Sequence, residues 1–263
     1  MDYSPSWSPD GKQIAFIRGI PAPDYKYAYD VFVMNADGSD QRRLTQIGSV
    51  SFPSGPAWSP DGTKIAFVGP PVGDYYSQVY VVNADGNDLR SIGRGTDPAW
   101  SPDGSKLAFT FGGLHLMNPD GSGRLQITAP KNSSPGRFDH DWKPVWSPDS
   151  MRILFIRSVG CDIDDTPVEP NCESIAVWTI NADGSNPAKV ADVATDGLAW
   201  SPDGTKIVFR GLDRYDLSTM ESDGSNVTRL TNTRDEYEWM PSWHATAMPL
   251  DVNPIDDVQF FVR

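Results

Sequence analysis

The sequence lacks the long apolar stretches of a membrane-spanning protein and is poor in residues that often carry chemistry. Hydrophobic residues make up 38% of the chain, but they are scattered. No run approaches the ~20 residues that a bilayer-crossing helix needs. Only three histidines are present, too few for a histidine-rich metal site. No G-x-S-x-G motif occurs, so nothing supports a hydrolase triad. We therefore expect no membrane insertion and no metal centre of that kind.

Basic residues are also in deficit. There are 22 lysines and arginines against 35 aspartates and glutamates, which gives a formal net charge of −13. A strongly negative surface repels the phosphates of nucleic acids and of anionic membranes, so we expect neither as a partner. The chain shows no secretory leader, and it enters a repeated phrase within its first residues. This start is typical of a mature segment or a fragment.

Cysteine is nearly absent, and both copies, Cys161 and Cys172, lie in the insert CDIDDTPVEPNC. Two cysteines this close in an otherwise cysteine-free chain favour a loop-closing disulfide, with two free thiols as the alternative. A disulfide across this loop would stabilise the fold by about 3 kcal/mol in the loop-entropy model. It would also indicate an oxidising compartment, so we expect a periplasmic or secreted location.

The same insert has acidic residues at a spacing close to that of an EF-hand calcium loop. The match fails because Pro167, whose ring fixes φ at about −65°, stands where the loop needs glycine with a positive φ. An irregular calcium site remains open, and its candidate ligands are Asp162, Asp164, Asp165 and Glu173. The alternative is a solvated acidic loop held by its disulfide. Apart from this calcium ion we expect no cofactor.

One feature of the sequence is abundant: a short phrase that recurs along the chain. The pentapeptide WSPDG occurs four times and WSPDS once, and the tryptophans that begin them are Trp7, Trp58, Trp100, Trp146 and Trp200. A sixth tryptophan, Trp243, stands in MPSWHA, where the rest of the phrase is lost. A second phrase runs in step with the first, as MNADGS, VNADGN, MNPDGS, INADGS and ESDGSN. The period is about 40–50 residues, which is the range of propeller repeats.

Each repeat predicts four short strands. In the first repeat, PSW ends one strand, SPDG turns, KQIAFI and DVFVMN alternate as two further strands, and RRLT follows the ADGS turn. Proline pre-sets φ at the first corner of such a turn, and glycine accepts the left-handed position. An aspartate before that glycine caps its own backbone. We therefore interpret the repeated aspartates as turn residues and not as catalytic acids; they are Asp10, Asp61, Asp103, Asp149 and Asp203, with Asp37, Asp85, Asp120, Asp183 and Asp223.

Four-stranded antiparallel units at this period are typical of an all-β β-propeller, with the tryptophan filling the gap between adjacent blades. The combination W-S-P-D-G-x-K-[IL]-[AV]-F and [VI]-N-A-D-G-S resembles the TolB-like, or PD40, repeats from residue 4 to about residue 243. The resemblance implies an exported bacterial propeller, commonly six-bladed. We expect residues 1–243 to form the propeller. Residues 244–263 would form a degenerate sixth blade or begin a following segment.

Two alternatives to the six-bladed fold stay open. Five blades alone would close the ring, or the chain would end in a helix, since Val258, Phe261 and Val262 have helical spacing after Asp256.

His115 occupies the slot of Phe32 in the third strand, and we interpret it as a packing residue.

Function is expected in the segments that do not repeat. In a propeller the connections from strand 2 to strand 3 and from strand 4 to the next strand 1 open on one face, and aromatic residues there indicate recognition. The alternative is that these aromatic residues cap the blade ends. The candidate binding residues are Tyr25, Tyr27, Tyr75, Tyr76, Tyr237 and Trp239, with Asp97, Asp139, His140 and Asp196 beside them. His140 is expected in a loop between two acids.

Two functions follow from these candidates. The first is a non-catalytic, monomeric recognition scaffold that binds a protein, peptide or glycan through the loop face and the axial channel. The second is a metal-dependent enzyme with an axial site built from Asp97, Asp139, His140 and Asp196. The absence of a catalytic set favours the scaffold, and the sequence does not name its ligand.

Overall fold

In the computed structural model the chain is built from strands and turns, and the part that the structure describes contains no helix. That part comprises residues 2–21, 28–47, 55–70, 76–131, 137–162, 172–193, 195–211, 216–232, 238–243 and 258–262. Its strands form five four-stranded antiparallel sheets and one two-stranded sheet. None of the described residues belongs to a helix long and apolar enough to cross a membrane. The fold is all-β with propeller-type blades, and the five complete sheets correspond to the five-bladed alternative.

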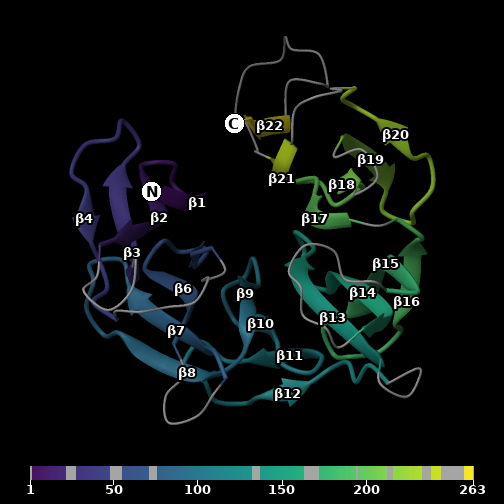
Figure 1. The fold of residues 1–263 in the computed structure, drawn as a ribbon, viewed down its shortest axis with the longest axis horizontal. Coiled ribbons are helices and arrows are strands. Elements are labelled where there is room, and N and C mark those ends of the chain that lie inside the picture. The colour runs from purple at the N-terminus through teal and green to yellow at the C-terminus, as the bar shows by residue number, and fades with distance from the viewer. Residues whose placement is uncertain are drawn as a thin grey trace. The chain divides into compact units, whose positions relative to one another are not determined.

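The chain divides into two compact units, and the first (Met1–Gln126) holds blades 1 to 3. Figure 1 draws them from purple to teal. Blade 1 consists of β1 (Asp2–Trp7), β2 (Gln13–Ile20), β3 (Ala28–Asn35) and β4 (Arg42–Arg43). Blade 2 consists of β5 (Ala57–Trp58), β6 (Lys64–Gly69), β7 (Gln78–Asn83) and β8 (Arg90–Arg94). Blade 3 consists of β9 (Thr96–Trp100), β10 (Leu107–Thr110), β11 (Leu114–Met117) and β12 (Leu125–Gln126).

The second unit (Ile127–Arg263) holds blades 4 and 5 and the two-stranded sheet. Blade 4 consists of β13 (Arg137–Trp146), β14 (Arg152–Asp162), β15 (Ser174–Asn181) and β16 (Ala188–Ala191). Blade 5 consists of β17 (Thr195–Trp200), β18 (Lys206–Gly211), β19 (Leu217–Glu221) and β20 (Thr228–Arg229). The two-stranded sheet pairs β21 (Glu238–Trp243) with β22 (Val258–Val262). Every blade keeps its strands in chain order, as the repeats predict.

The core of unit 1 lies between its sheets, and blade 2 is buried on both faces. Ile65 and Phe67 of β6 pack in a cluster with blade 1 residues such as Val33. Ala66, between them in β6, packs on the other face with Phe109 of blade 3. Successive residues of a strand point to opposite faces, so a blade with two neighbours needs apolar residues at nearly every position. In the middle strands of this blade the residues between the strand ends are accordingly apolar without a break, from Ile65 to Val68 in β6 and from Val79 to Val82 in β7.

The repeated tryptophan joins adjacent blades, as the sequence predicts. The indole Nε1 of Trp58 donates a hydrogen bond to the carbonyl of Ser6 in the preceding blade at 3.1 Å. Trp100 donates in the same way to the carbonyl of Ala57 at 3.1 Å. In unit 2, Trp200 donates to the carbonyl of Val145 at 3.4 Å. Each acceptor directly precedes the tryptophan of the previous repeat, so one contact is used again at successive seams.

The last described segment, β22, is a strand and not a helix. Val258 pairs with Trp243, and Phe261 pairs with Trp239, in an antiparallel ladder that joins β22 to β21. The helical reading of the apolar spacing is wrong because a partner strand supplies backbone hydrogen bonds to a segment rich in β-branched and aromatic residues. The boundary expected at residue 243 stays a prediction.

Candidate functional site

The two ends of each blade have different connections. At one end, called the turn end, the two repeated turns touch: the Ala36 amide donates to the Lys12 carbonyl at 2.8 Å. At the opposite end, called the loop end, the connections that do not repeat come together. In blade 2 the Gly95 amide, after strand 4, donates to the carbonyl of Ser77, before strand 3, at 2.9 Å. These two kinds of connection share one end of the blade, as expected.

The repeated aspartates at the turn end are structural. Asp103 Oδ1 accepts hydrogen bonds from the Ser101 hydroxyl at 2.6 Å and from the Ser105 amide at 3.0 Å. These bonds stabilise the carboxylate and hold the pKa of Asp103 below its ordinary value of 3.8. The same serine bond lowers the pKa of the equivalent carboxylates, which are Asp10, Asp61, Asp149 and Asp203. The predicted turn role is confirmed.

Near the loop end of unit 1, aromatic and cationic side chains gather in what we call the Arg124 cluster. Tyr76, Arg94 and Arg124 are exposed, Phe111 is partly buried and Phe109 is buried. Tyr76 is 56% exposed, and its ring meets Phe111 edge-on with centroids 5.6 Å apart. The Arg94 guanidinium lies 5.3 Å from the centre of the Tyr76 ring. The Arg124 guanidinium lies 4.6 Å from the centre of Phe109 and 5.1 Å from that of Phe111. Blades 2 and 3 both contribute, so the cluster spans a seam between them.

His115 lies beneath this cluster as a packing residue, as predicted. It is 7% exposed, and its ring stacks on Phe109 with centroids 5.3 Å apart. Its Nδ1 lies 3.3 Å from the carbonyl of Gly113. Burial lowers the pKa of His115, because the charged imidazolium would lose its hydration. Phe32 lies opposite Phe16 in the same register of blade 1, with ring centroids 5.8 Å apart, so His115 takes the place of an aromatic packing residue.

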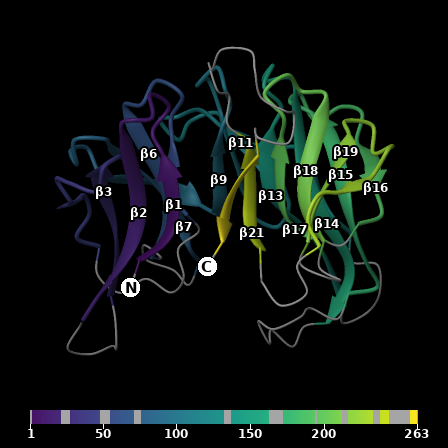
Figure 2. The same cartoon turned by 90° about the horizontal axis from the view of Figure 1, so that it is seen from above.

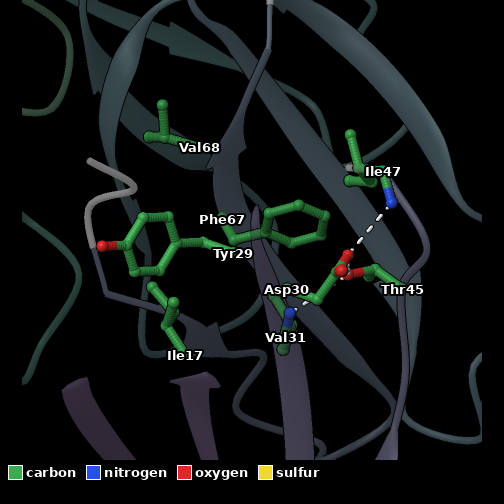
Figure 3. A pocket seen from close by; sticks show the side chains of 8 residues that line it. All are labelled: Ile17, Tyr29, Asp30, Val31, Thr45, Ile47, Phe67 and Val68. Carbon is green, nitrogen blue, oxygen red and sulfur yellow. Dashed lines mark hydrogen bonds between the residues drawn. The ribbon is translucent and has the colours of Figure 1, made fainter. Parts of the chain in front are cut away.

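A small pocket near the loop end of blade 1 contains a buried carboxylate, Asp30 (Figure 3). Asp30 accepts hydrogen bonds from Arg43 at 2.5 Å, from the Thr45 hydroxyl at 2.8 Å and from the Ile47 amide at 3.0 Å. The cavity measures about 10 Å³, which is room for about one water molecule. A carboxylate this well paired, in so small a space, ties strands together and does not form a ligand pocket.

Asp97 lies at a β-bulge in the first strand of blade 3. Its φ is +51°, a left-handed value that is unusual for a residue with a side chain. Ser4 and Lys143 occupy the equivalent place in blades 1 and 4, with φ of +48° and +50°. The Thr96 hydroxyl donates to the Asp97 carboxylate at 3.2 Å. Sequence reasoning missed this recurring bulge, since the residue before the proline is Ser, Asp or Lys and not glycine.

His140 and Asp139 lie in strand β13, so the expected loop is wrong there. His140 pairs with Ser158 of β14, while a register shift at Asp139 marks a bulge. The extra residue of this bulge lies in β14, opposite Asp139, and the Asp139 carboxylate accepts a hydrogen bond from the Gly160 amide at 3.0 Å. His140 and Phe138 are exposed, with ring centroids 6.3 Å apart. The long β13–β14 hairpin forms because pairing continues past the loop end, and Figure 2 shows its teal end reaching below the other strands of unit 2.

The predicted disulfide is present. Cys161, the next-to-last residue of β14, is bonded to Cys172 with an S–S distance of 2.05 Å. Glu173, a candidate calcium ligand, forms an ion pair with Arg137 at 2.9 Å. Asp164, Asp165 and the side chain of Asp162 lie outside the described residues. Among the side chains that are described, no three His, Cys, Asp or Glu residues gather as a metal site.

Several predicted binding residues lie outside the described part of the chain: Tyr25, Tyr27, Tyr75 and Tyr237. The backbones of Asp196 and Trp239 belong to β17 and β21, but their side chains are not described. Of the remaining candidates, Tyr76 joins the Arg124 cluster and Asp97 lies in unit 1, while Asp139 and His140 lie in unit 2.

Arg94, Phe111 and Arg124 were not among the predicted binding residues. One signal was available: an arginine stands two residues after the strand 2 phenylalanine in repeats 1 and 4, and repeat 3 has Phe111 at that place. Repeats 2 and 5 have Gly69 and Gly211 there, so the aromatic residue at that position distinguishes blade 3 from the other blades.

The comparisons with known proteins agree with the fold. The PD40 family, described as TolB beta propeller domain, matches residues 1–162. The TolB structure from Acinetobacter baumannii is 18% identical with a TM-score of 0.65, covering 89% of this chain and 55% of that one. A putative TolB from Agrobacterium tumefaciens is 21% identical with a TM-score of 0.61, covering 88% of this chain and 80% of that one.

An oligogalacturonate lyase in complex with manganese is similar as well, at 12% identity and a TM-score of 0.52, covering 87% of this chain and 76% of that one. Identities this low show the fold alone. The chain spans about half the length of the Acinetobacter TolB that it matches. A comparison with curated protein sequences gave no significant match.

Proposed function

Since the chain belongs to the family of TolB beta propeller domains, we propose that it is a non-catalytic recognition scaffold that binds a protein, peptide or glycan. The observation that carries the proposal is the exposure of aromatic side chains near the loop end of the blades. Tyr76 of blade 2 is 56% exposed, Phe138 of blade 4 is 38% exposed, and Tyr3 of blade 1 is 37% exposed.

These rings are rigid, and each already rests on a neighbour. Tyr3 meets Tyr29 edge-on at 5.9 Å, and Tyr76 meets Phe111 at 5.6 Å. Aromatic side chains held in place lose little entropy when a ligand covers them, which is why they are enriched at binding hot spots. At the turn end the repeated phrase exposes Trp7, at 43%, and otherwise polar turn residues with single aliphatic side chains such as Leu89 and Met151. The exposed rings near the loop end come instead from three different blades. Recognition therefore belongs to the loop end.

An array of peptides and glycans probed with the labelled protein tests this proposal. We expect the Tyr76→Ala and Phe138→Ala variants to lose at least about tenfold in the signal of a bound probe, the usual scale for a hot-spot aromatic. The matched controls are Leu89→Ala and Met151→Ala, because these exposed apolar residues flank the turns at the opposite end. Equal losses in the control variants, or an unchanged signal in the double variant Tyr76→Ala/Phe138→Ala, would contradict the assigned end.

The scaffold is exported and acts as a monomer in this proposal. The disulfide between Cys161 and Cys172 supports an oxidising compartment, because cytosolic thiols are kept reduced. Alkylation of the protein as isolated from cells should leave both cysteines unlabelled, and mass spectrometry would detect any labelled fraction. Size-exclusion chromatography with light scattering measures the oligomeric state directly.

A further inference from the structure

Two blades neutralise a stacked arginine with an aspartate of their own first strand. In blade 1, Arg18 lies 4.9 Å from the centre of the Phe16 ring and donates two hydrogen bonds to Asp2, at 2.6 and 2.7 Å. In blade 4, Arg157 donates two hydrogen bonds to the buried Asp141, also at 2.6 and 2.7 Å. A paired fork of this kind is the strongest arrangement between a guanidinium and a carboxylate.

Blade 3 also has a stacked arginine, but it comes from the turn before β12, and Gly95, directly before β9, stands where blades 1 and 4 have Asp2 and Asp141. Arg124 lies over the rings of Phe109 and Phe111, and its Nη1 donates to the backbone carbonyl of Arg94 at 3.0 Å. No carboxylate within the described part of the chain forms an ion pair with Arg124. Partial burial and the neighbouring Arg94 charge lower the pKa of Arg124, so its positive charge is held at a cost that a nearby anion would relieve.

We propose that the Arg124 cluster binds a carboxylate of an acidic peptide segment on a protein partner, in the role that Asp2 and Asp141 fill inside blades 1 and 4. The inference rests on the proposed scaffold function and names the chemistry of one of its contacts. Arg124 supplies the planar fork, and Phe111 with Tyr76 supplies apolar ring surface for the side chains that flank the carboxylate.

The net charge of −13 repels a highly acidic ligand at long range, but it does not prevent a single carboxylate from binding in direct contact with Arg124. At physiological ionic strength charges are screened beyond about 8 Å, so the field at the cluster is set by its own groups. Within it stand two guanidinium groups, those of Arg94 and Arg124, beside aromatic rings. We therefore expect a ligand with few carboxylates and flanking apolar residues, and not a polyanion.

The surroundings of Arg124 favour a peptide over an acidic sugar. A uronic acid presents hydroxyl groups beside its carboxylate, and these need hydrogen-bonding side chains around the ring. Around Arg124 the described side-chain contacts are instead ring faces, from Phe109 and Phe111, beside the backbone carbonyl of Arg94. A glutamate flanked by aromatic or aliphatic residues matches that combination.

The test uses two matched probes, N-acetyl-Phe-Glu-Phe-amide and N-acetyl-Phe-Gln-Phe-amide, with the full chain at physiological salt. NMR of the wild-type protein follows the Nε–Hε signal of Arg124 during titration. We expect the glutamate probe to shift this signal and to bind about tenfold more tightly than the glutamine probe, as a charged hydrogen bond requires. Glucuronate is titrated as a third probe.

Two variants and a control connect the binding to Arg124. Arg124→Gln should remove the preference for the glutamate probe, and Arg124→Lys should keep only part of it because the planar fork is lost. The control is Arg90→Gln, which removes the same charge from β8, where Arg90 pairs with Asp88 at 3.1 Å. The wild-type titration needs no variant, so it decides the matter even where Arg124→Gln fails to fold.

Each outcome has a defined meaning. Equal binding of both peptides would overturn the carboxylate site. Tighter binding of glucuronate than of the glutamate peptide would overturn the peptide assignment. Equal losses of affinity for the glutamate peptide in Arg90→Gln and Arg124→Gln would overturn the role of Arg124. If no probe binds while the array signal still depends on Tyr76, this inference fails and the proposed scaffold function stands.

Discussion

At the scale of single residues, the chain places left-handed backbone where each repeat needs a turn. The glycine of WSPDG has φ near +70° in four copies: Gly11, Gly62, Gly104 and Gly204. The fifth copy has Ser150 in the same conformation, with φ of +61°. A residue with a Cβ pays a steric cost there that glycine avoids. The turn forms anyway, because the bonds around it are those of the other copies: the Ser150 amide donates to the Ser147 carbonyl at 2.9 Å.

Replacing Ser150 with glycine should therefore stabilise the protein. We expect Ser150→Gly to raise the free energy of unfolding of unit 2 by about 1 kcal/mol, the cost of a left-handed non-glycine residue. The reverse change, Gly104→Ser, should destabilise unit 1 by a similar amount. Urea unfolding followed by circular dichroism measures both, and a lower midpoint for Ser150→Gly would show that the serine contributes a contact that outweighs its strain.

At the scale of elements, the stability of a blade depends on the seam with its neighbour. Trp58 is 8% exposed and donates its indole hydrogen to Ser6 across the seam, while Trp7 is 43% exposed. The same residue type in the same phrase thus has two environments. The sequence of the repeated phrase is the same around Trp7 and Trp58, so only the packing of the blades distinguishes the buried tryptophan from the exposed one.

The Trp58→Phe variant tests the seam. It removes the hydrogen bond to Ser6 and part of the buried ring, so we expect unit 1 to lose about 2 kcal/mol. Trp7→Phe makes the same chemical change at an exposed position and should cost less than about 0.5 kcal/mol. Denaturant midpoints from circular dichroism compare the two, and equal losses would mean that the seam contact contributes no stability of its own.

At the scale of the whole molecule, the acidic composition is partly built into the turns. Ten turn aspartates have a pKa below the ordinary value of 3.8, because serine or asparagine side chains and backbone amides donate to their carboxylates. A folded-state pKa below the unfolded one means that these groups stabilise the fold above pH 3.8. That contribution is lost as the pH falls through the folded values.

Acid should therefore unfold the protein over a narrow range. We expect the urea midpoint to change little between about pH 7 and pH 5 and to fall steeply below about pH 4, because the unfolded chain then binds more protons. Asp103→Asn should be less stable than the wild type at neutral pH and should show a shallower fall. A midpoint that stays level down to about pH 3 would contradict the contribution of the turn aspartates.

Much of the fold was predictable because it depends on local residue preferences that recur in each repeat. The turn phrases, the four strands in each unit, the aspartate caps, His115 as a packing residue and the Cys161–Cys172 disulfide all follow from residue type and spacing. The errors lie where a partner strand decides the outcome. His140 became part of a strand because β14 continues beside it, and the C-terminal segment became β22 because β21 pairs with it.

The sequence by itself determined the class of blade, its turns and its acidic charge, since these depend on φ preferences and on composition. Only the tertiary structure decided which cations are neutralised and which remain available. Arg18 and Arg124 are both arginines stacked on the strand 2 phenylalanine of their blades, yet a neighbouring strand supplies Asp2 to the first, and none of the described residues supplies a carboxylate to the second. The reason is physical: an ion pair requires two groups within a few ångströms, and strands from different parts of the chain set that distance.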